Sequence, residues 1–225
     1  MIAGTTEGRK SEMNSLRDTV FGDLNLTDWL AYPATHAAAV AFGEVKELAA
    51  ADDPGLSGAL SQIAGDQTLE TRHRLEAHHI ARIFGQPLKD ARYEAWGVVV
   101  EASVHGGLDT LAAYQDYFAH YYNFAGGSVV WENPDQSLHP LIDDVIDAAR
   151  SALPRIGLWE GPRRTTLEQG WGRLNILTPQ GLCFGEAPLQ TLDQDIIARP
   201  LLHAATRLMK ELTAMASSER NARKS

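Results

Sequence analysis

The stretch from residue 96 to residue 132 constrains the fold more than any other part of the chain. It contains four short segments rich in β-branched or aromatic residues, each closed by a glycine pair or a short polar turn. Turns this short join antiparallel neighbours, because a parallel crossover needs about a dozen residues or more. The sequence therefore predicts an antiparallel meander. Its four strands are Trp96–Val104, Asp109–Gln115, Phe118–Phe124 and Ser128–Glu132.

Two further strands, Arg173–Thr178 and Leu182–Glu186, follow later in the chain. The turn Thr178-Pro179-Gln180-Gly181 joins them and places proline and glycine where a type I turn favours them. The meander and this hairpin together predict one mainly antiparallel sheet of about six strands. Helices on either side would pack on the sheet, so the predicted fold class is α+β, preceded by an N-terminal helical segment.

Helical patterns account for most of the remaining chain. The predicted helices are Trp29–Ala50, Leu56–Ile63, a helix capped by Asp66 that ends at Phe84, Leu138–Leu153, and a last helix capped by Asp193 that reaches about Met215. Gly85 and Pro87 are the expected stop signals of the third helix. Pro200 fits the last helix if that helix starts at Arg199, because proline is tolerated in a first turn.

Composition divides the chain near residue 90, where alanine-rich helix gives way to strand. We predict a polar N-terminal arm (1–26), a helical segment (27–88), an α+β domain (89–215) that forms one compact unit with the helical segment, and a disordered basic tail (216–225). Met1 and Met13 are both candidate starts of the protein.

The overall composition excludes several classes of protein. Hydrophobic residues make up 44% and charged residues 22%, as in ordinary globular proteins. No apolar run approaches the ~18 residues of a transmembrane helix, so we expect no membrane insertion. The formal charge of −9 repels phosphate backbones, so we expect no nucleic-acid binding. Cys183 is the only cysteine, which fits a reducing cytoplasm, and its apolar surroundings in sequence predict a buried thiol rather than a reactive one.

A metal-binding hypothesis rests on one helix. Glu76 and His79 have the i,i+3 spacing by which a helix presents a carboxylate and an imidazole to one divalent metal, and Glu101 and His105 could complete the site. Di-metal bundles need a second Glu-x-x-His pair, which this sequence lacks. A solvated polar helix face around residues 72–76 is therefore the favoured interpretation, and no cofactor is expected.

A ligand-binding hypothesis rests on the predicted sheet. Alternation along the first strand gives one apolar face and one polar face. Polar and aromatic residues of the neighbouring strands would extend the polar face. The candidate ligand-binding residues are Glu101, Ser103, His105, Tyr114, His120 and Tyr122. The alternatives are a contact with another protein and a plain solvated face, which antiparallel sheets often have.

The sequence contains no nucleophile elbow, no Walker loop and no Gly-x-Gly-x-x-Gly motif. We therefore expect a cytoplasmic, non-enzymatic protein-interaction module. A metal-dependent enzyme that uses the Glu and His ligands, and a sensor domain that binds a small ligand, are the alternatives.

Self-association is a further expectation. The predicted strands Ser128–Glu132 and Leu182–Glu186 contain no lysine or proline to blunt a sheet edge. The last helix carries a broad apolar stripe from Ile196 to Leu212 that could exceed what one sheet face covers. We predict a two-fold homodimer, which Leu201→Asp or Leu208→Asp would dissociate if that helix forms the contact.

Overall fold

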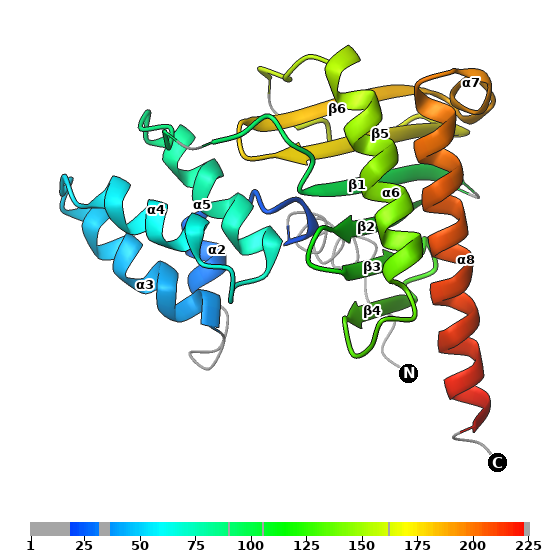
Figure 1. Cartoon of the computed structure of the whole chain (residues 1–225), viewed down its shortest axis with the longest axis horizontal. Helices are drawn as coiled ribbons and strands as arrows, with labels where there is room; N and C mark the ends of the chain where they lie inside the picture. The colour runs from blue at the N-terminus through cyan, green and yellow to red at the C-terminus, as the bar shows by residue number, and fades with distance from the viewer. Residues whose placement is uncertain (1–18, 32–36, 90, 105, 162, 223–225) are drawn as a thin grey trace. The chain divides into compact units, whose positions relative to one another are not determined.

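The computed structural model describes residues 19–31, 37–89, 91–104, 106–161 and 163–222 (Figure 1). The chain divides into two compact units, residues 1–91 and residues 92–225. The boundary lies where alanine-rich helix gives way to strand. That the helical segment and the sheet domain form one compact unit stays a prediction. Most of the predicted polar arm lies outside the described residues, but Thr19, Val20 and Phe21 at its end are helical and buried.

Besides the helical residues 19–21, the first unit contains α2 (Leu26–Leu30), α3 (Ala37–Ala50), α4 (Leu56–Gly65) and α5 (Thr71–Ile83). Phe42, Val45, Leu60 and Ile80 are among the buried side chains of its core. The single helix predicted from Trp29 to Ala50 is instead α2 and α3. Residues 32–36 between them lie outside the described residues.

The ends of α5 show how local hydrogen bonds fix a helix. Asp66 does not cap it, because Asp66 Oδ1 accepts hydrogen bonds from the amide (2.9 Å) and the hydroxyl (2.7 Å) of Thr68 and so closes a turn before the helix. The predicted stop at Phe84 is confirmed. Gly85 follows with φ of +67°, a conformation that glycine adopts without strain.

The second unit contains a six-stranded antiparallel sheet in the order β4-β3-β2-β1-β5-β6, with helices packed on it. The α+β prediction is confirmed. The strands are β1 (Gly97–Val104), β2 (Gly107–Tyr114), β3 (Phe118–Tyr122), β4 (Ser128–Glu132), β5 (Trp171–Thr178) and β6 (Gly181–Pro188). Each lies within a few residues of its predicted position.

Strand β1 lies inside the sheet, paired with β2 on one side and β5 on the other. Its run Val98-Val99-Val100 is buried on both faces. This position explains the continuous β-branched run, because a strand that is covered on both faces carries apolar residues without alternation.

One face of the sheet packs against α6 (His139–Ala152) and α8 (Ala198–Ala222), which run side by side across the strands (Figure 1). The short elements η1 (Leu153–Arg155) and α7 (Leu189–Gln194) lie at the ends of this layer. Ile142 and Val145 of α6 meet Leu208 and Leu212 of α8 in the core, and all four side chains are fully buried.

The apolar stripe of α8 is covered, contrary to the expectation of a spare contact surface. Leu201, Leu208 and Leu212 are at most 1% exposed, because the sheet and α6 together cover them. Only Ile196, before the helix, is largely exposed, at 77%. Leu201 and Leu208 are therefore core residues, and their substitution would test folding rather than association.

The start of α8 differs from the prediction by two residues. Asp195, not Asp193, caps the helix, and its Oδ1 accepts hydrogen bonds at 2.8 Å from the amides of Ile197 and Ala198. Pro200 lies in the first turn, as predicted. The helix continues past Met215 to Ala222, so residues 216–222 of the predicted disordered tail are helical. Within the described residues, no helix combines the length and hydropathy that a membrane crossing requires.

Candidate functional site

The face of the sheet opposite α6 and α8 carries the residues predicted to bind a ligand. We call it the polar face. Strand alternation places on it the following side chains: Glu101, Ser103, Thr110, Tyr114, His120, Tyr122, Arg173, Asn175 and Glu186. His105 lies outside the described residues.

The polar face is not a solvated surface. Glu101 and Asn175 are 0% exposed, and Ser103, Tyr114 and His120 are buried as well. The interpretation as a plain wet face is therefore wrong for these residues. Buried polar groups need hydrogen-bond partners, and on this face much of the pairing is among the strands themselves.

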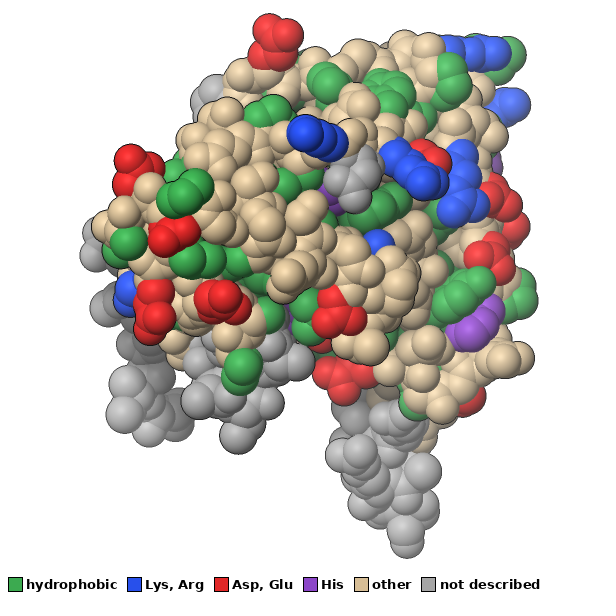
Figure 2. Space-filling model, turned by 60° about the vertical axis from the view of Figure 1, so that its left-hand side comes forward, with side chains coloured by type: hydrophobic (Ala, Val, Ile, Leu, Met, Phe, Trp, Pro, Cys, Tyr) green, Lys and Arg blue, Asp and Glu red, His purple; other side chains and the backbone are tan. Residues whose placement is uncertain are grey.

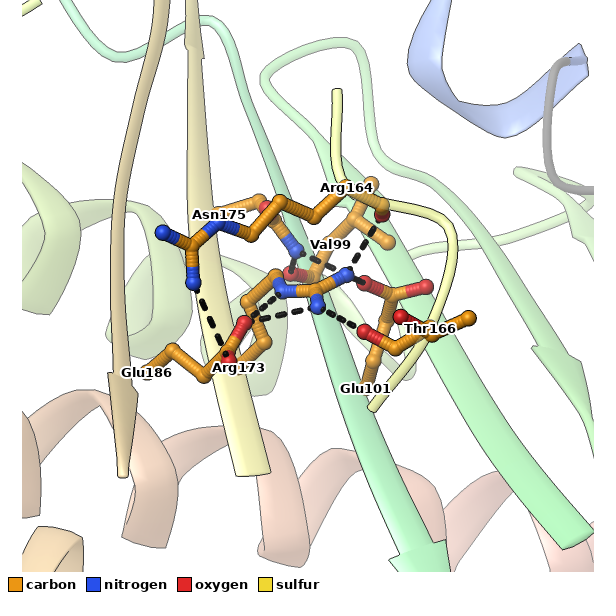
Figure 3. A network of polar contacts seen from close by, with 7 residues as sticks. All are labelled: Val99, Glu101, Arg164, Thr166, Arg173, Asn175 and Glu186. Atoms are coloured by element: carbon orange, nitrogen blue, oxygen red, sulfur yellow. Dashed lines mark hydrogen bonds and ion pairs between the residues drawn. The ribbon is translucent and has the colours of Figure 1, made fainter. Parts of the chain in front are cut away.

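Arg173 of β5 is the centre of the pairing (Figure 3). Its Nε and Nη2 both lie 2.6 Å from Oε2 of Glu186 on β6, and its Nη1 donates to Oε2 of Glu101 on β1 at 3.0 Å. Two carbonyl oxygens of the loop before β5 complete the set. Nη1 donates to the carbonyl of Arg164 at 2.7 Å and Nη2 to that of Thr166 at 2.5 Å.

The guanidinium donates four hydrogen bonds, to two carboxylates and two carbonyl oxygens, and its Nη2 forms an ion pair with Glu186 as well. Asn175 adds hydrogen bonds from Nδ2 to the carbonyl of Val99 (2.9 Å) and to Glu101 (3.4 Å). The arginine is thus surrounded by acceptors of the chain itself. The network is a clamp between three strands and a loop.

The loop held by the clamp spans residues 156–170. Its second attachment is Trp159, whose amide donates to the carbonyl of Leu182 on β6 at 2.7 Å. The Trp159 ring packs against Phe184 with a centroid separation of 5.1 Å, and the Arg164 guanidinium lies over both rings at 5.5 and 5.7 Å. The loop is therefore fastened to β5 and β6 by charge, main chain and ring contacts.

The other predicted ligand residues form a smaller group. His120 Nδ1 lies 3.2 Å from the hydroxyl of Tyr122, and Tyr114 meets the His120 ring edge-on at 6.1 Å. The structure thus brings Tyr114, His120 and Tyr122 together, while Glu101 joins the arginine clamp instead.

Sequence reasoning missed Arg173, Asn175 and Glu186. The signal was present, because Arg173 lies opposite Glu101 on one side and opposite Glu186 on the other. Opposite charges on paired strands stabilise a sheet. These opposite charges can be recognised as neighbours only when β5 is known to pair with β1. That pairing joins residues that lie far apart in the sequence.

The candidate metal ligands lie on α5 in the first unit. Glu76 is fully buried and His79 is partly buried. His73, Arg74 and His78 are buried as well, so the solvated helix face expected around residues 72–76 is wrong. Arg74 Nε, for example, donates to the carbonyl of Ala64 at 3.0 Å. In the part of the chain that the structure describes, no three His, Cys, Asp or Glu side chains are placed to hold a metal ion.

Cys183 on β6 is fully buried, which confirms the prediction of a buried thiol. Burial raises its pKa. The hydroxyl of Tyr93 lies 3.5 Å from its sulfur and donates to the carbonyl of Ile156. Burial, followed by the contact with Cys183, raises the pKa of Tyr93 to about 12.

Strand β4 forms one edge of the sheet, and its outer side pairs with no described strand. The amide of Asn123 donates to the carbonyl of Gly127, so these two residues form a hydrogen-bonded pair. In an antiparallel ladder, hydrogen-bonded and non-hydrogen-bonded residue pairs alternate from there along β3 and β4. Val129 and Trp131 therefore direct their N–H and C=O groups toward β3. Ser128, Val130 and Glu132 direct theirs outward. The Val130 side chain is 48% exposed.

Comparisons with protein-family models, with curated proteins and with solved structures found no match for the chain. Its function is therefore inferred from its own residues. Two features bear on it: a polar face whose arginine pairs with groups of the chain itself, and a sheet edge whose outward main-chain groups pair with no described strand.

Proposed function

We propose that the chain is a non-enzymatic protein-interaction module that pairs with a second copy of itself through the edge strand β4. The observation that carries the proposal is the outward set of main-chain groups on Ser128, Val130 and Glu132. An open strand edge is a template for pairing with another chain unless it is blunted. Strand β4 contains no lysine and no proline.

The sequence of β4 suits pairing with itself. In a two-fold antiparallel arrangement Val130 faces Val130 of the second copy, and Ser128 faces Glu132. All three outward residues then sit in hydrogen-bonded positions, which allows up to about six main-chain hydrogen bonds across the junction. The half-exposed Val130 side chains would meet at the centre.

The opposite edge of the sheet is a poorer template. The amide of Trp159 already occupies the carbonyl of Leu182 on β6, and β6 ends in Pro188. Proline and a covering loop are two of the usual ways to block an edge. The comparison favours β4 over β6 as the contact.

Two features of the chain support a binding role without catalysis. Arg173, a buried cation of the polar face, is already engaged by two carboxylates and two carbonyls of the chain itself. On the face drawn in Figure 2, hydrophobic side chains form small separate groups among charged and polar ones. A contact made through main-chain hydrogen bonds fits such a surface, because it does not need a large hydrophobic patch. The single buried cysteine is compatible with the reducing cytoplasm that we assign to the chain.

The test compares the mass of the full chain in solution with that of Val130→Pro. Proline removes the outward N–H at the centre of the junction, yet it fits an edge strand because that N–H does not serve β3. In a dimer two central hydrogen bonds are lost, which costs about 2 kcal/mol, or roughly a 30-fold weaker association. Val130→Thr keeps the N–H and the β-branched shape and is the matched control.

Sedimentation at several protein concentrations gives the result. We expect a dimer for the unmodified chain and for Val130→Thr, and a monomer over the same concentrations for Val130→Pro. A monomeric unmodified chain would refute self-pairing. A Val130→Pro dimer as strong as that of the control would place the contact elsewhere than β4.

A further inference from the structure

A pocket of about 250 Å³ lies between α8 and the sheet, on the face opposite the polar face. Strands β1, β2 and β3 form its floor, and α7 and α8 form its walls. Ala102 on β1 and Ala205 on α8 leave the space that larger side chains would fill. Partly buried Val104, Leu202 and Met209 line it as well and give it access from solvent.

The lining is apolar except for three groups, Asp109, Tyr121 and Thr206, and it contains no Lys, Arg or His. The Tyr121 hydroxyl donates to Oδ2 of Asp109 at 2.8 Å, and Oδ1 of Asp109 accepts from the amide of Phe124 at 2.8 Å. The Thr206 hydroxyl donates to the carbonyl of Leu202 at 2.8 Å.

The direction of these hydrogen bonds decides what the pocket can hold. Tyr121 and Thr206 have each given their only proton to another acceptor, and a carboxylate has none. Burial, and then the hydrogen bond to Asp109, raise the pKa of Tyr121, so its proton stays in place. The polar part of the lining therefore offers acceptor lone pairs and one negative charge. A neutral acceptor or an anion would meet no donor there.

We propose that this pocket binds a small primary amine with an apolar body, whose ammonium group donates to Asp109. An ammonium has three donors and a positive charge, and hydrogen bonds between ions are about twice as strong as neutral ones. The apolar body would occupy the space between Ala102 and Ala205. No residue of strand β4 lines the site, so the proposal can be tested independently of the proposed self-pairing.

The test uses two probes of the same shape. We expect 2-phenylethylamine, which is cationic at neutral pH, to bind about ten-fold more tightly than the neutral 2-phenylethanol. Titrations of the full chain followed by nuclear magnetic resonance report both the affinity and the place of binding. The shifted resonances should include those of Ala102, Tyr121 and Ala205.

Three variants locate the interaction. Asp109→Asn keeps the shape of the side chain and should remove the preference for the amine, whereas Asp144→Asn, at an exposed carboxylate paired with Arg207, should leave it unchanged. Ala205→Leu should fill the pocket and abolish binding of both probes. Circular dichroism checks that each variant is folded.

Equal affinities for the amine and the alcohol would overturn the proposal. An amine preference that survives Asp109→Asn, or binding that survives in folded Ala205→Leu, would do the same. Absence of binding by the unmodified chain at millimolar amine would also overturn it. If Asp109→Asn fails to fold, the comparison of the two probes on the unmodified chain and on Ala205→Leu still decides.

Discussion

Replacing Arg173 by methionine removes a buried cation that pairs with two carboxylates on the polar face. Glu101, which is fully buried, then loses its ion pair with Arg173, and Glu186 keeps its contact with the exposed Arg164, at 3.5 Å. The carbonyls of Arg164 and Thr166 also lose their donor. Removing one partner of a buried ion pair costs about 3–5 kcal/mol, because the remaining charge is stranded away from water.

A loss of this size is a large part of the stability of an ordinary domain, which is about 5–15 kcal/mol. Urea unfolding at neutral pH, followed by circular dichroism, measures it. Arg164→Met is the matched control. Its side chain is 52% exposed and contacts the same Glu186, so the loss of that ion pair should cost at most about 1 kcal/mol.

A double variant distinguishes the cost of leaving the Glu101 carboxylate buried from the cost of losing the packing of the Arg173 side chain. In Arg173→Met combined with Glu101→Gln the buried carboxylate is gone, so the double variant should recover part of the loss. Equal costs for Arg173→Met and Arg164→Met would refute the interpretation of the network as a clamp.

Three further predictions concern stability. Leu208→Asp places a charge where the structure has a fully buried leucine, so we expect the free energy of unfolding in urea to fall by about 4 kcal/mol or more. Ile196→Asp, at a residue that is 77% exposed, should stay within about 0.5 kcal/mol of the parent. Equal effects would contradict the placement of α8. Gly85→Ala should lower the melting temperature, because alanine is strained at φ of +67°. Gly58→Ala, inside α4 where a Cβ has open space, should raise it. A change of the same sign in both variants would contradict the assignment of Gly85 as the residue that ends α5. The pKa of the Cys183 thiol is raised in the folded chain, so above pH 9.0, the ordinary thiol pKa, only the unfolded chain readily loses this proton. The free energy of unfolding should therefore fall as pH rises above 9.0, the ordinary thiol pKa, and the fall should be shallower in Cys183→Ala. The same pH profile in both proteins would argue against a raised pKa.

The sequence predicted those parts of the fold whose signals are local. Runs of β-branched residues such as Val98-Val99-Val100, and turns such as Thr178–Gly181, placed all six strands to within a few residues. The stop at Phe84 was predicted because glycine ends a helix by its own backbone freedom. These features depend on neighbours in the chain, so one sequence is enough to find them.

The parts that depended on distant neighbours were not predicted. The polar face looked solvated because the partner of Glu101, Arg173, comes from a strand that follows only after α6 and a long loop. The stripe of α8 looked exposed because the share of it that α6 covers cannot be counted from the sequence. Asp193 and Asp195 are both plausible caps in the sequence. The structure separates their roles, because Asp195 accepts hydrogen bonds from the amides at the start of α8 and Asp193 contacts His203 at 2.6 Å.

The candidate site likewise had parts that depend on neighbours in the sequence, which were predicted, and parts that depend on distant residues, which were not. Alternation along β1 correctly placed Glu101 and Ser103 on one face, and the sequence of β4 showed an unblunted strand. The order of the strands, which makes β4 an edge, required the structure. The acceptor lining of the pocket also required it, because hydrogen-bond direction is a property of packed side chains.

Hydrogen exchange along β4 tests the proposed self-pairing most directly. The amides of Val129 and Trp131 face β3 and should be protected at every protein concentration. The amides of Val130 and Glu132 face outward, so they should be protected at high concentration and lose that protection on dilution, as the second copy leaves. If Val130 and Glu132 exchange as freely at high concentration as at low, β4 is not the contact and the proposed function is wrong.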